Sequence, residues 1–383
     1  MHQFISADLE GPPEFFVALE KLGLEFSESE DEATDLAFSM RPEGQESFHF
    51  SGPAYPAAFT ATGLDGAASG VIAGLIGTFG LQLDENKLCL HAAALELNGK
   101  GIIIPAIFNA GKSSLVAVLG FHQSKILSDD AIIINLATGK ISGFGLPIRL
   151  RQKYLQTVSP EFRNWVQQRL LFAGNRFVFI KPETTPSDNI ELDHILMLAR
   201  DASHQGEPNI GPAPLSEALH RFVWHNISRN RSPHIMLKLL KHYLRNVGCF
   251  RLRYAEAEQT ASWLLQQNLN FDPSEANIGS EAPNFAAFNE RFHVEQVDDK
   301  LFVSDEESSF IYELNESAYV IWRLAMEMQG REELLQALGV LYAEADAAAL
   351  EKSLDDAIPL LAQNQLLHPE LAQRFAQQSP TVS

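Results

Sequence analysis

Residues 101–120, GIIIPAIFNAGKSSLVAVLG, decide the fold class of this chain. The apolar run at 101–105 predicts a strand, and SSLVAVL at 113–119 predicts a helix. Between the two lies a glycine-bearing loop that ends in Lys112 and Ser113. Such a loop can wrap its backbone N–H groups around phosphates, and the start of the helix adds a favourable potential. The stretch therefore predicts an α/β core with a phosphate-binding loop, a P-loop.

The loop residues have separate roles in this interpretation. Lys112 would neutralise phosphate charge, and the Ser113 hydroxyl would ligate magnesium. The predicted nucleotide-binding residues are Asn109, Ala110, Gly111, Lys112, Ser113 and Ser114. Ala106 stands where the full pattern has glycine, and a left-handed alanine there would cost about 1 kcal/mol. A chance Gly-Lys-Ser sequence at an ordinary helix start is the alternative.

Further strands and helices complete the predicted core. A strand over 88–97 is expected to pair with 101–105 through Asn98 and Gly99, a two-residue turn. Other strands are expected at 125–135, 176–181 and 190–198, and helices near 215–227 and 233–246. We therefore predict a nucleotide-binding domain over 89–267. Residues 1–88, with a helix expected at 13–22, form an α+β segment of unclear role.

Asp129 and Asp130 lie in the middle of the strand expected at 125–135. Neighbouring side chains on a strand face opposite ways, so two carboxylates need two partners unless a bulge or strand end re-aims one. A metal ion and a substrate hydroxyl would supply them. The alternative is a single acid at a strand end that pairs with a basic neighbour. His91 lies on the strand expected before the loop, where a lone histidine is usually a core residue.

Composition excludes several classes of protein. The chain has 383 residues, of which 45% are hydrophobic, enough for two or three domains with real cores. Its formal charge of −20 repels nucleic acid and anionic membrane, and neither is expected as a partner. Cys89 and Cys249 cannot form a disulfide framework, and the first residues lack the features of a secretory signal. The apolar stretch at 70–83 is too short to cross a bilayer, so a cytoplasmic protein is expected.

The charge is unevenly distributed. Between residues 218 and 255 there are no acidic residues and eight basic ones: Arg221, Arg229, Arg231, Lys238, Lys241, Arg245, Arg251 and Arg253. This stretch would face an acidic C-terminal domain or an acidic peptide, or it is simply a solvated helix face. Residues 268–289 have the composition of a linker.

A separate domain is expected over 290–370, with a flexible tail at 371–383. Strands are expected at 293–296, 301–304 and 310–314, followed by helices at 317–328, 331–342 and 347–363. Asn315 and Ser317 can cap the first of these helices, and Gly330 can end it. This order is that of a winged-helix module. The 18 acidic and 5 basic residues of 290–370 give it a strongly negative charge.

Three motifs in order resemble the HPr serine kinase family: LHAAA at 90–94, KSSL at 112–115 and LSDD at 127–130. They are most similar to the HPr kinase-related proteins encoded in peptide-modification gene clusters, and the likeness covers about residues 60–200. The resemblance implies that Lys112 and Ser113 bind ATP phosphates and Mg²⁺. It also implies that Asp129 takes the proton from a substrate hydroxyl, that Asp130 assists the metal and that His91 orients the pair.

Some family features have no certain counterpart in this chain. Which of Asp129 and Asp130 is the base stays open, and a second acidic metal ligand cannot be placed. Arg149 and Arg151 are candidates for the basic residue that contacts phosphate or substrate. Ala106 and Asn109 depart from the family loop.

The C-terminal residues are similar to PqqD-like proteins, the modules that recognise leader peptides in ribosomal peptide modification. The motifs are LFVS at 301–304, IYELNESA at 311–318, IW at 321–322, EEL at 332–334 and QLL at 365–367. In such proteins the third strand and the neighbouring helix accept the peptide. The corresponding residues here are Phe310, Ile311, Tyr312, Glu313 and Leu314.

Together these features predict an ATP- and Mg²⁺-dependent kinase for a Ser or Thr hydroxyl of a ribosomally made precursor peptide, held by its own C-terminal domain. A variant is a nucleotide-binding but non-catalytic peptide scaffold for another enzyme. A winged-helix DNA-binding regulator is disfavoured, because its domain would carry the wrong charge. The sequence is compatible with a homo-oligomer but does not fix the oligomeric state.

Overall fold

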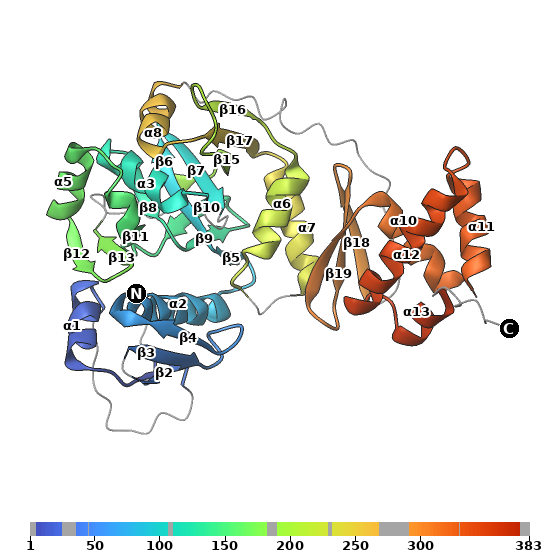
Figure 1. Ribbon diagram of the computed structural model, residues 1–383, viewed down its shortest axis with the longest axis horizontal. Helices are drawn as coiled ribbons and strands as arrows, with labels where there is room; N and C mark the ends of the chain where they lie inside the picture. Colours follow the sequence, from blue (N-terminus) through green and yellow to red (C-terminus); the bar gives the residue numbers. More distant parts are fainter. Residues whose placement is uncertain are drawn as a thin grey trace. The chain divides into compact units, whose positions relative to one another are not determined.

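The chain folds into two compact units, Met1–Ile278 and Gly279–Ser383 (Figure 1). A computed structural model describes residues 5–24, 36–44, 46–105, 110–181, 190–228, 232–267, 291–328 and 330–375. The range 268–289, predicted as a linker, lies outside the described residues, as do Ala106 and Asn109 of the loop. The segment 1–88 and the nucleotide-binding domain predicted after it belong to the same unit.

The larger unit is mixed α/β, and its largest sheet has six strands in the order β16-β17-β15-β7-β6-β8. These are β6 (Ala92–Leu97), β7 (Lys100–Pro105), β8 (Lys125–Ser128), β15 (His194–Arg200), β16 (Asn209–Pro212) and β17 (Gly248–Tyr254). β7, β15 and β17 run parallel, so their carboxyl ends meet at one edge. Ligands bind at such an edge in open α/β sheets.

Helices pack on this sheet through apolar faces. They are α3 (Lys112–Phe121), α4 (Gln152–Leu155), α5 (Pro160–Gln168), α6 (Leu215–Trp224), α7 (Pro233–Leu244) and α8 (Ala257–Gln266). The buried residues Leu115 and Leu119 of α3 share one core with Trp165 and Leu264. The β6–β7 turn confirms the prediction at Asn98 and Gly99, which both have positive φ. The fold thus fixes α3 directly behind the loop that follows β7.

Two smaller sheets flank the first. One has the order β14-β10-β9-β5 and contains β5 (Lys87–Leu90), β9 (Ile132–Asn135), β10 (Lys140–Gly143) and β14 (Ile190–Glu191). The other has the order β11-β13-β12 and contains β11 (Ile148–Arg151), β12 (Leu170–Ala173) and β13 (Phe177–Ile180).

Three strands predicted as continuous are each divided between two sheets, and that part of the prediction was wrong. The run 88–97 is β5 and β6, broken at His91, and 125–135 is β8 and β9, broken after Ser128. The run 190–198 is β14 and β15. In the first two runs both halves are largely apolar and buried, so hydrophobic periodicity does not reveal the break. In the third run β14 is only Ile190 and the exposed Glu191, too short to show a pattern.

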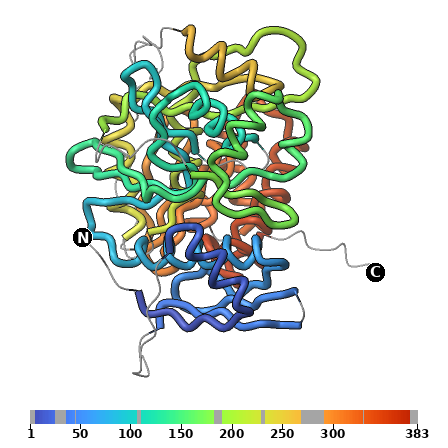
Figure 2. The backbone as a smooth tube through the Cα atoms, turned by 90° about the vertical axis from the view of Figure 1, so that its left-hand side faces the viewer, coloured from blue at the N-terminus to red at the C-terminus, as the bar shows by residue number. Residues whose placement is uncertain are grey.

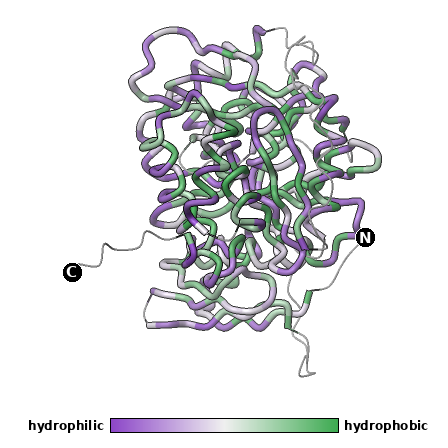
Figure 3. Tube along the Cα trace, turned by 90° about the vertical axis from the view of Figure 1, so that its right-hand side faces the viewer, coloured by the Kyte–Doolittle hydropathy of each residue, from purple (hydrophilic) through white to green (hydrophobic). Residues whose placement is uncertain are grey.

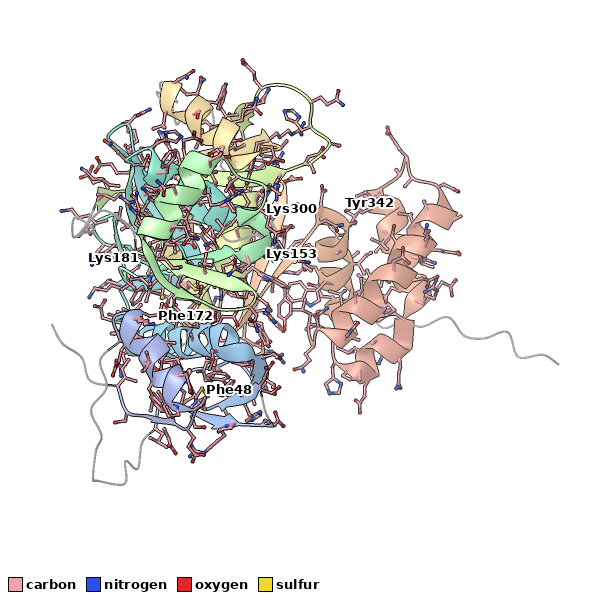
Figure 4. The ribbon with its side chains drawn as sticks, turned by 60° about the vertical axis from the view of Figure 1, so that its left-hand side comes forward. Phe48, Lys153, Phe172, Lys181, Lys300 and Tyr342 are labelled. Carbon is pink, nitrogen blue, oxygen red and sulfur yellow. The ribbon has the colours of Figure 1, made fainter. Side chains whose placement is uncertain are left out.

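The N-terminal segment forms a layer of its own at one end of the larger unit (Figure 2). Its sheet, in the order β1-β2-β3-β4, is built from β1 (Ala7–Leu9), β2 (Phe38–Pro42), β3 (Ser47–Ser51) and β4 (Phe59–Thr62), with helices α1 (Pro13–Lys21) and α2 (Gly63–Gln82). Phe48 of β3 and Phe172 of β12, labelled in Figure 4, contribute to one apolar core. The segment is therefore packed against the rest of its unit.

Helix α2 is long and apolar enough to cross a membrane by length and composition, and 67% of its apolar window is buried in the fold. The sequence-based length was wrong because the helix begins at Gly63, seven residues before the apolar stretch. A Cβ at Gly77 would lie 2.0 Å from the carbonyl oxygen of Ala54. Glycine at this position therefore lets α2 lie directly against the neighbouring backbone.

The smaller unit has a three-stranded antiparallel sheet followed by four helices. They are β18 (Phe292–Val297), β19 (Lys300–Asp305), β20 (Phe310–Leu314), α10 (Glu316–Glu327), α11 (Arg331–Leu341), α12 (Ala347–Gln363) and α13 (Pro369–Phe375). The Asn315 side chain accepts a hydrogen bond from the Ala318 N–H, which confirms the predicted cap. Trp322 is fully buried and donates to the Leu366 carbonyl at 2.9 Å. Apolar residues, green in Figure 3, follow the strands and the inner helix turns of this core.

Two boundary predictions in this unit were wrong. Gly330 does not end the first helix, which stops at Glu327; it caps the start of α11 instead. The tail predicted from residue 371 is helical up to Phe375, whose side chain is buried in the core. The guanidinium of Arg331 donates to the Phe375 carbonyl at 3.0 Å, so α13 is part of the folded unit.

Candidate functional site

Lys112 begins α3 and forms a buried ion pair with Asp129. Its Nζ lies 3.0 Å from the Asp129 Oδ1 and also donates to the Asp129 carbonyl oxygen. The two side chains are 8% and 1% exposed. A buried charge without a partner destabilises the fold, so Lys112 and Asp129 each hold the other's side chain in position. This pair links the predicted phosphate-binding lysine to the predicted acidic pair.

Asp130 has different partners from Asp129. Separate partners were expected, because the side chains of adjacent residues face different ways. His91 Nε2 lies 3.0 Å from its Oδ1, and an Arg149 nitrogen lies 3.8 Å from its Oδ2. Burial raises the pKa of Asp130, but the His91 hydrogen bond and the charges of Arg149 and Lys112 outweigh burial and lower it well below the usual range. Asp130 is therefore an ionised carboxylate at neutral pH, and its side chain is 23% exposed.

The strand breaks explain how these side chains meet. His91 lies between β5 and β6, and Asp129 and Asp130 lie between β8 and β9, where the chain crosses from one sheet to another. Arg149 comes from β11, where its guanidinium lies 5.1 Å from the centre of the Phe177 ring. Arg151, further along the same strand, is exposed. Of the two candidate arginines, Arg149 is the one beside Asp130.

His225 also belongs to this cluster and was missed by sequence reasoning. It follows the last residue of α6, and its carbonyl accepts the His91 backbone N–H at 2.9 Å. The two imidazole rings are 5.7 Å apart in an edge-to-face arrangement. Burial, followed by the neighbouring charges, lowers the pKa of His225 to about 4. No local pattern marks this residue, because the contact joins segments far apart in the sequence.

The end of the loop is held by Tyr254, at the carboxyl end of β17. Its buried hydroxyl donates to the Ala110 carbonyl at 2.5 Å. Gly111 has φ of +78°, a backbone conformation that favours glycine. A Cβ there would also lie 2.8 Å from the Tyr254 hydroxyl oxygen, which is too close for any other residue. Among the described residues no side chain caps the start of α3 at Gly111, and N–H groups at a helix start can bind a phosphate. Ser113 and Ser114, in the first turn, are half-buried.

The oxygen ligands available here fit magnesium better than zinc. Within the part of the chain that the structure describes, no three His, Cys, Asp or Glu residues form a group that could hold a metal ion. Mg²⁺ commonly takes only one or two protein oxygens and completes its shell with phosphate and water. Ser113 and Asp130 are the predicted ligands and are of that chemical type.

The predicted peptide-binding residues lie in the other unit, on β20. This strand is at the edge of its sheet, in the order β18-β19-β20. Phe310 is 64% exposed, Ile311 and Tyr312 are half-buried, and Glu313 forms an ion pair with Lys300 at 3.4 Å. Leu314 is buried. One side of β20 is paired with β19, which leaves the other for a further strand.

Comparisons with known proteins give one clear assignment. Residues 301–367 match the family model described as coenzyme PQQ synthesis protein D (PqqD), so the smaller unit is a PqqD-like domain. The Hpr(Ser) kinase/phosphatase from Coxiella burnetii is a solved structure similar to 46% of this chain and 91% of its own, at 12% identity and a TM-score of 0.21. A TM-score this low establishes no shared fold. A search of curated proteins found no match.

Proposed function

We propose that the chain is an ATP-dependent kinase that phosphorylates a Ser or Thr hydroxyl of a ribosomally made precursor peptide in the cytoplasm. The observation that carries this proposal is the convergence of Lys112, His91, Arg149 and two carboxylates at the start of α3, behind the carboxyl end of β7. Phosphoryl transfer needs cations around the moving phosphoryl group and an acceptor for the hydroxyl proton. The cluster contains both.

Each residue has a role in that reaction. Lys112, at the helix start, would exchange Asp129 for the phosphates, and the N–H groups in the first turn of α3 would add to their binding. Bound Mg²⁺ would neutralise phosphate charge, held by Ser113 and by one carboxylate of the acidic pair. Arg149 would stabilise charge that develops on the transferred group.

The two carboxylates differ in solvent exposure, and this difference supports Asp130 rather than Asp129 as the catalytic base. Asp129 is almost fully buried, whereas Asp130 is partly exposed and ionised. The exposure supports Asp130 as the carboxylate that orients the substrate hydroxyl and takes its proton. Asp129 would then act on the phosphate side, beside Lys112. His91 holds Asp130 in place through its Nε2.

The PqqD-like domain would recruit the substrate. By its resemblance to leader-recognition modules, the open edge of β20 would accept the leader peptide as a fourth strand. Main-chain hydrogen bonds would then give affinity, and side-chain pockets would give specificity. The acceptor residue of the same peptide would reach the kinase site on the other unit.

A second candidate function is a nucleotide-responsive scaffold that presents the leader to another enzyme. The buried Lys112–Asp129 pair favours it, because a lysine that keeps this partner is not available to phosphates. Both functions use the PqqD-like domain in the same way. They differ only in whether the larger unit completes phosphoryl transfer.

One experiment separates the two. The purified chain is incubated with ATP, Mg²⁺ and the precursor peptide encoded next to its gene, and the peptide is analysed by mass spectrometry. Kinase activity predicts the mass of one added phosphoryl group on a Ser or Thr. Nucleotide binding by calorimetry without transfer would identify the scaffold. No binding of ATP at all would refute both functions of the larger unit.

A further inference from the structure

Trp224, the last residue of α6, is 75% exposed. The buried tryptophans of the chain behave differently: Trp165 is 8% exposed and Trp322 is fully buried. A large aromatic side chain in water is unfavourable, and exposed tryptophans are enriched where proteins bind partners. The exposure of Trp224 therefore points to a partner.

The indole is held in place by a neighbour on the same helix. His220 stacks on it, with ring centroids 6.1 Å apart and an interplanar angle of 12°. A side chain that is already ordered loses less entropy when a ligand arrives. The pair His220 and Trp224, called here the aromatic platform, is thus prepared for binding.

The helix that carries the platform ends next to the candidate reaction site. Trp224 is followed directly by His225, whose carbonyl binds the His91 N–H and whose ring contacts the His91 ring. The pairing continues beyond His225, since the Ile227 N–H donates to the Cys89 carbonyl at 2.8 Å. The end of α6 is therefore fixed to the strand break that carries His91. A peptide with its hydroxyl at Asp130 can therefore extend along the end of α6, where the platform lies.

The charges around the platform define the kind of peptide. In this acidic chain, residues 218–255 contain no acidic side chain. The nearest acid on α6, Glu217, is already in ion pairs with Arg221 and Arg251. Helix α7, which packs beside α6 (Figure 1), adds exposed Ile235 and exposed Lys238. The surroundings are apolar and cationic, which is complementary to an acidic peptide with an apolar residue.

We propose that the aromatic platform docks the acceptor part of the substrate peptide, a segment with an apolar side chain and acidic residues close to the phosphorylated hydroxyl. This surface is separate from β20, which would bind the leader. The inference rests on the proposed kinase function for its biological meaning. The docking itself is measured without catalysis.

The test uses the full chain and two leaderless synthetic peptides labelled with fluorescein. Both carry one serine and one leucine, flanked by glutamates in the first and by lysines in the second. Fluorescence anisotropy measures binding to the parent, Trp224→Ala, Trp224→Phe and Val340→Ala. Val340 is an apolar residue of the smaller unit that is 80% exposed, and it serves as the matched control.

We expect the parent to bind the acidic peptide more tightly than the basic one. Trp224→Ala should weaken binding of the acidic peptide about tenfold, as truncation of an aromatic hot spot does. Trp224→Phe should retain most of the affinity, and Val340→Ala all of it. Because Trp224 is exposed, circular dichroism and ATP affinity should be unchanged in every variant.

Equal affinity of the parent and Trp224→Ala for the acidic peptide would overturn the proposal, and so would a preference for the basic peptide or no binding of either. A dimeric parent that becomes monomeric on Trp224→Ala would instead assign the platform to a second copy of the chain, which also overturns it. Failure of the kinase proposal has another signature: the platform binds the acidic peptide, but no peptide becomes phosphorylated.

Discussion

Because Lys112 is paired with the buried Asp129, any substitution of Lys112 affects the stability of the fold as well as the binding of ATP. With Lys112→Ala, phosphate charge in the loop is left uncompensated and ATP binding should be lost. The same change leaves Asp129 buried without its cation, which costs about 3 kcal/mol or more. The double variant Lys112→Ala/Asp129→Asn should recover most of that stability without recovering ATP binding. Calorimetry with ATP and thermal unfolding measure the two effects separately.

Parental ATP affinity in a folded Lys112→Ala protein would contradict the phosphate-binding role of the lysine. Equal stability of the single and double variants would mean that the ion pair contributes nothing to the fold.

Neutralising Asp129 and neutralising Asp130 should have different effects on ATP binding and on phosphotransfer. Asp130→Asn removes the exposed, ionised acceptor, so ATP binding should persist while phosphotransfer falls by about a hundredfold or more. Asp129→Asn removes the partner of Lys112, so it should alter ATP affinity more than the catalytic step. Single-turnover transfer to the precursor peptide and ATP calorimetry distinguish the two. The reverse pattern would restore Asp129 as the base.

His225 should make the larger unit sensitive to mild acid. Its folded-state pKa of about 4 lies below the usual histidine value near 6.5. Between these values the unfolded chain binds a proton that the folded chain does not, so stability falls as the pH drops from about 6.5 to 4. His225→Asn should flatten that part of the curve. Unfolding midpoints across this pH range test the difference, and parallel curves for the parent and His225→Asn would refute it.

At the scale of elements, sequence patterns identified the strands and helix around the loop and the strands of the smaller unit, but not β1–β4, α2 or β17, and not where strands change sheets. The runs around His91 and Asp129 are apolar on both sides, so nothing local marks the breaks that bring these residues together. The loop and the acidic pair were singled out because their chemistry lies in adjacent residues, whereas His91 was singled out only by the resemblance to the HPr serine kinase family. His225 was not, because it meets His91 only through the packing of α6. The helical end at Phe375 was missed because it runs directly into the polar residues 376–383, with which it was grouped as a tail.

The edge strand β20 gives a test at the same scale. Adjacent residues of an edge strand point their N–H groups in opposite directions, so only one of Ile311 and Tyr312 faces β19. Proline at the inward position should unfold the isolated fragment 291–375, since it removes a ladder hydrogen bond. Proline at the outward position should leave the fragment folded but unable to bind the leader. NMR spectra with the precursor leader measure both properties, and normal leader binding by both proline variants would refute strand addition.

Over the whole molecule, the proposed function assigns recognition to the smaller unit and chemistry to the larger one, so their covalent connection should matter for one class of substrate only. A leader held by the PqqD-like domain keeps the acceptor residue near the kinase site, at an effective concentration in the millimolar range for a short flexible connection. When residues 1–267 and 291–383 are produced separately and mixed, the advantage disappears, because binding of the leader no longer places the acceptor near Lys112.

We therefore expect the intact chain to phosphorylate the full precursor with a KM about a hundredfold or more below that of the mixed units. A leaderless peptide should show the same KM with both preparations, and so should ATP. Steady-state phosphorylation with the two peptides measures the difference directly. If the mixed units match the intact chain on the full precursor, the leader activates the enzyme by contact and the connection between the units does not contribute.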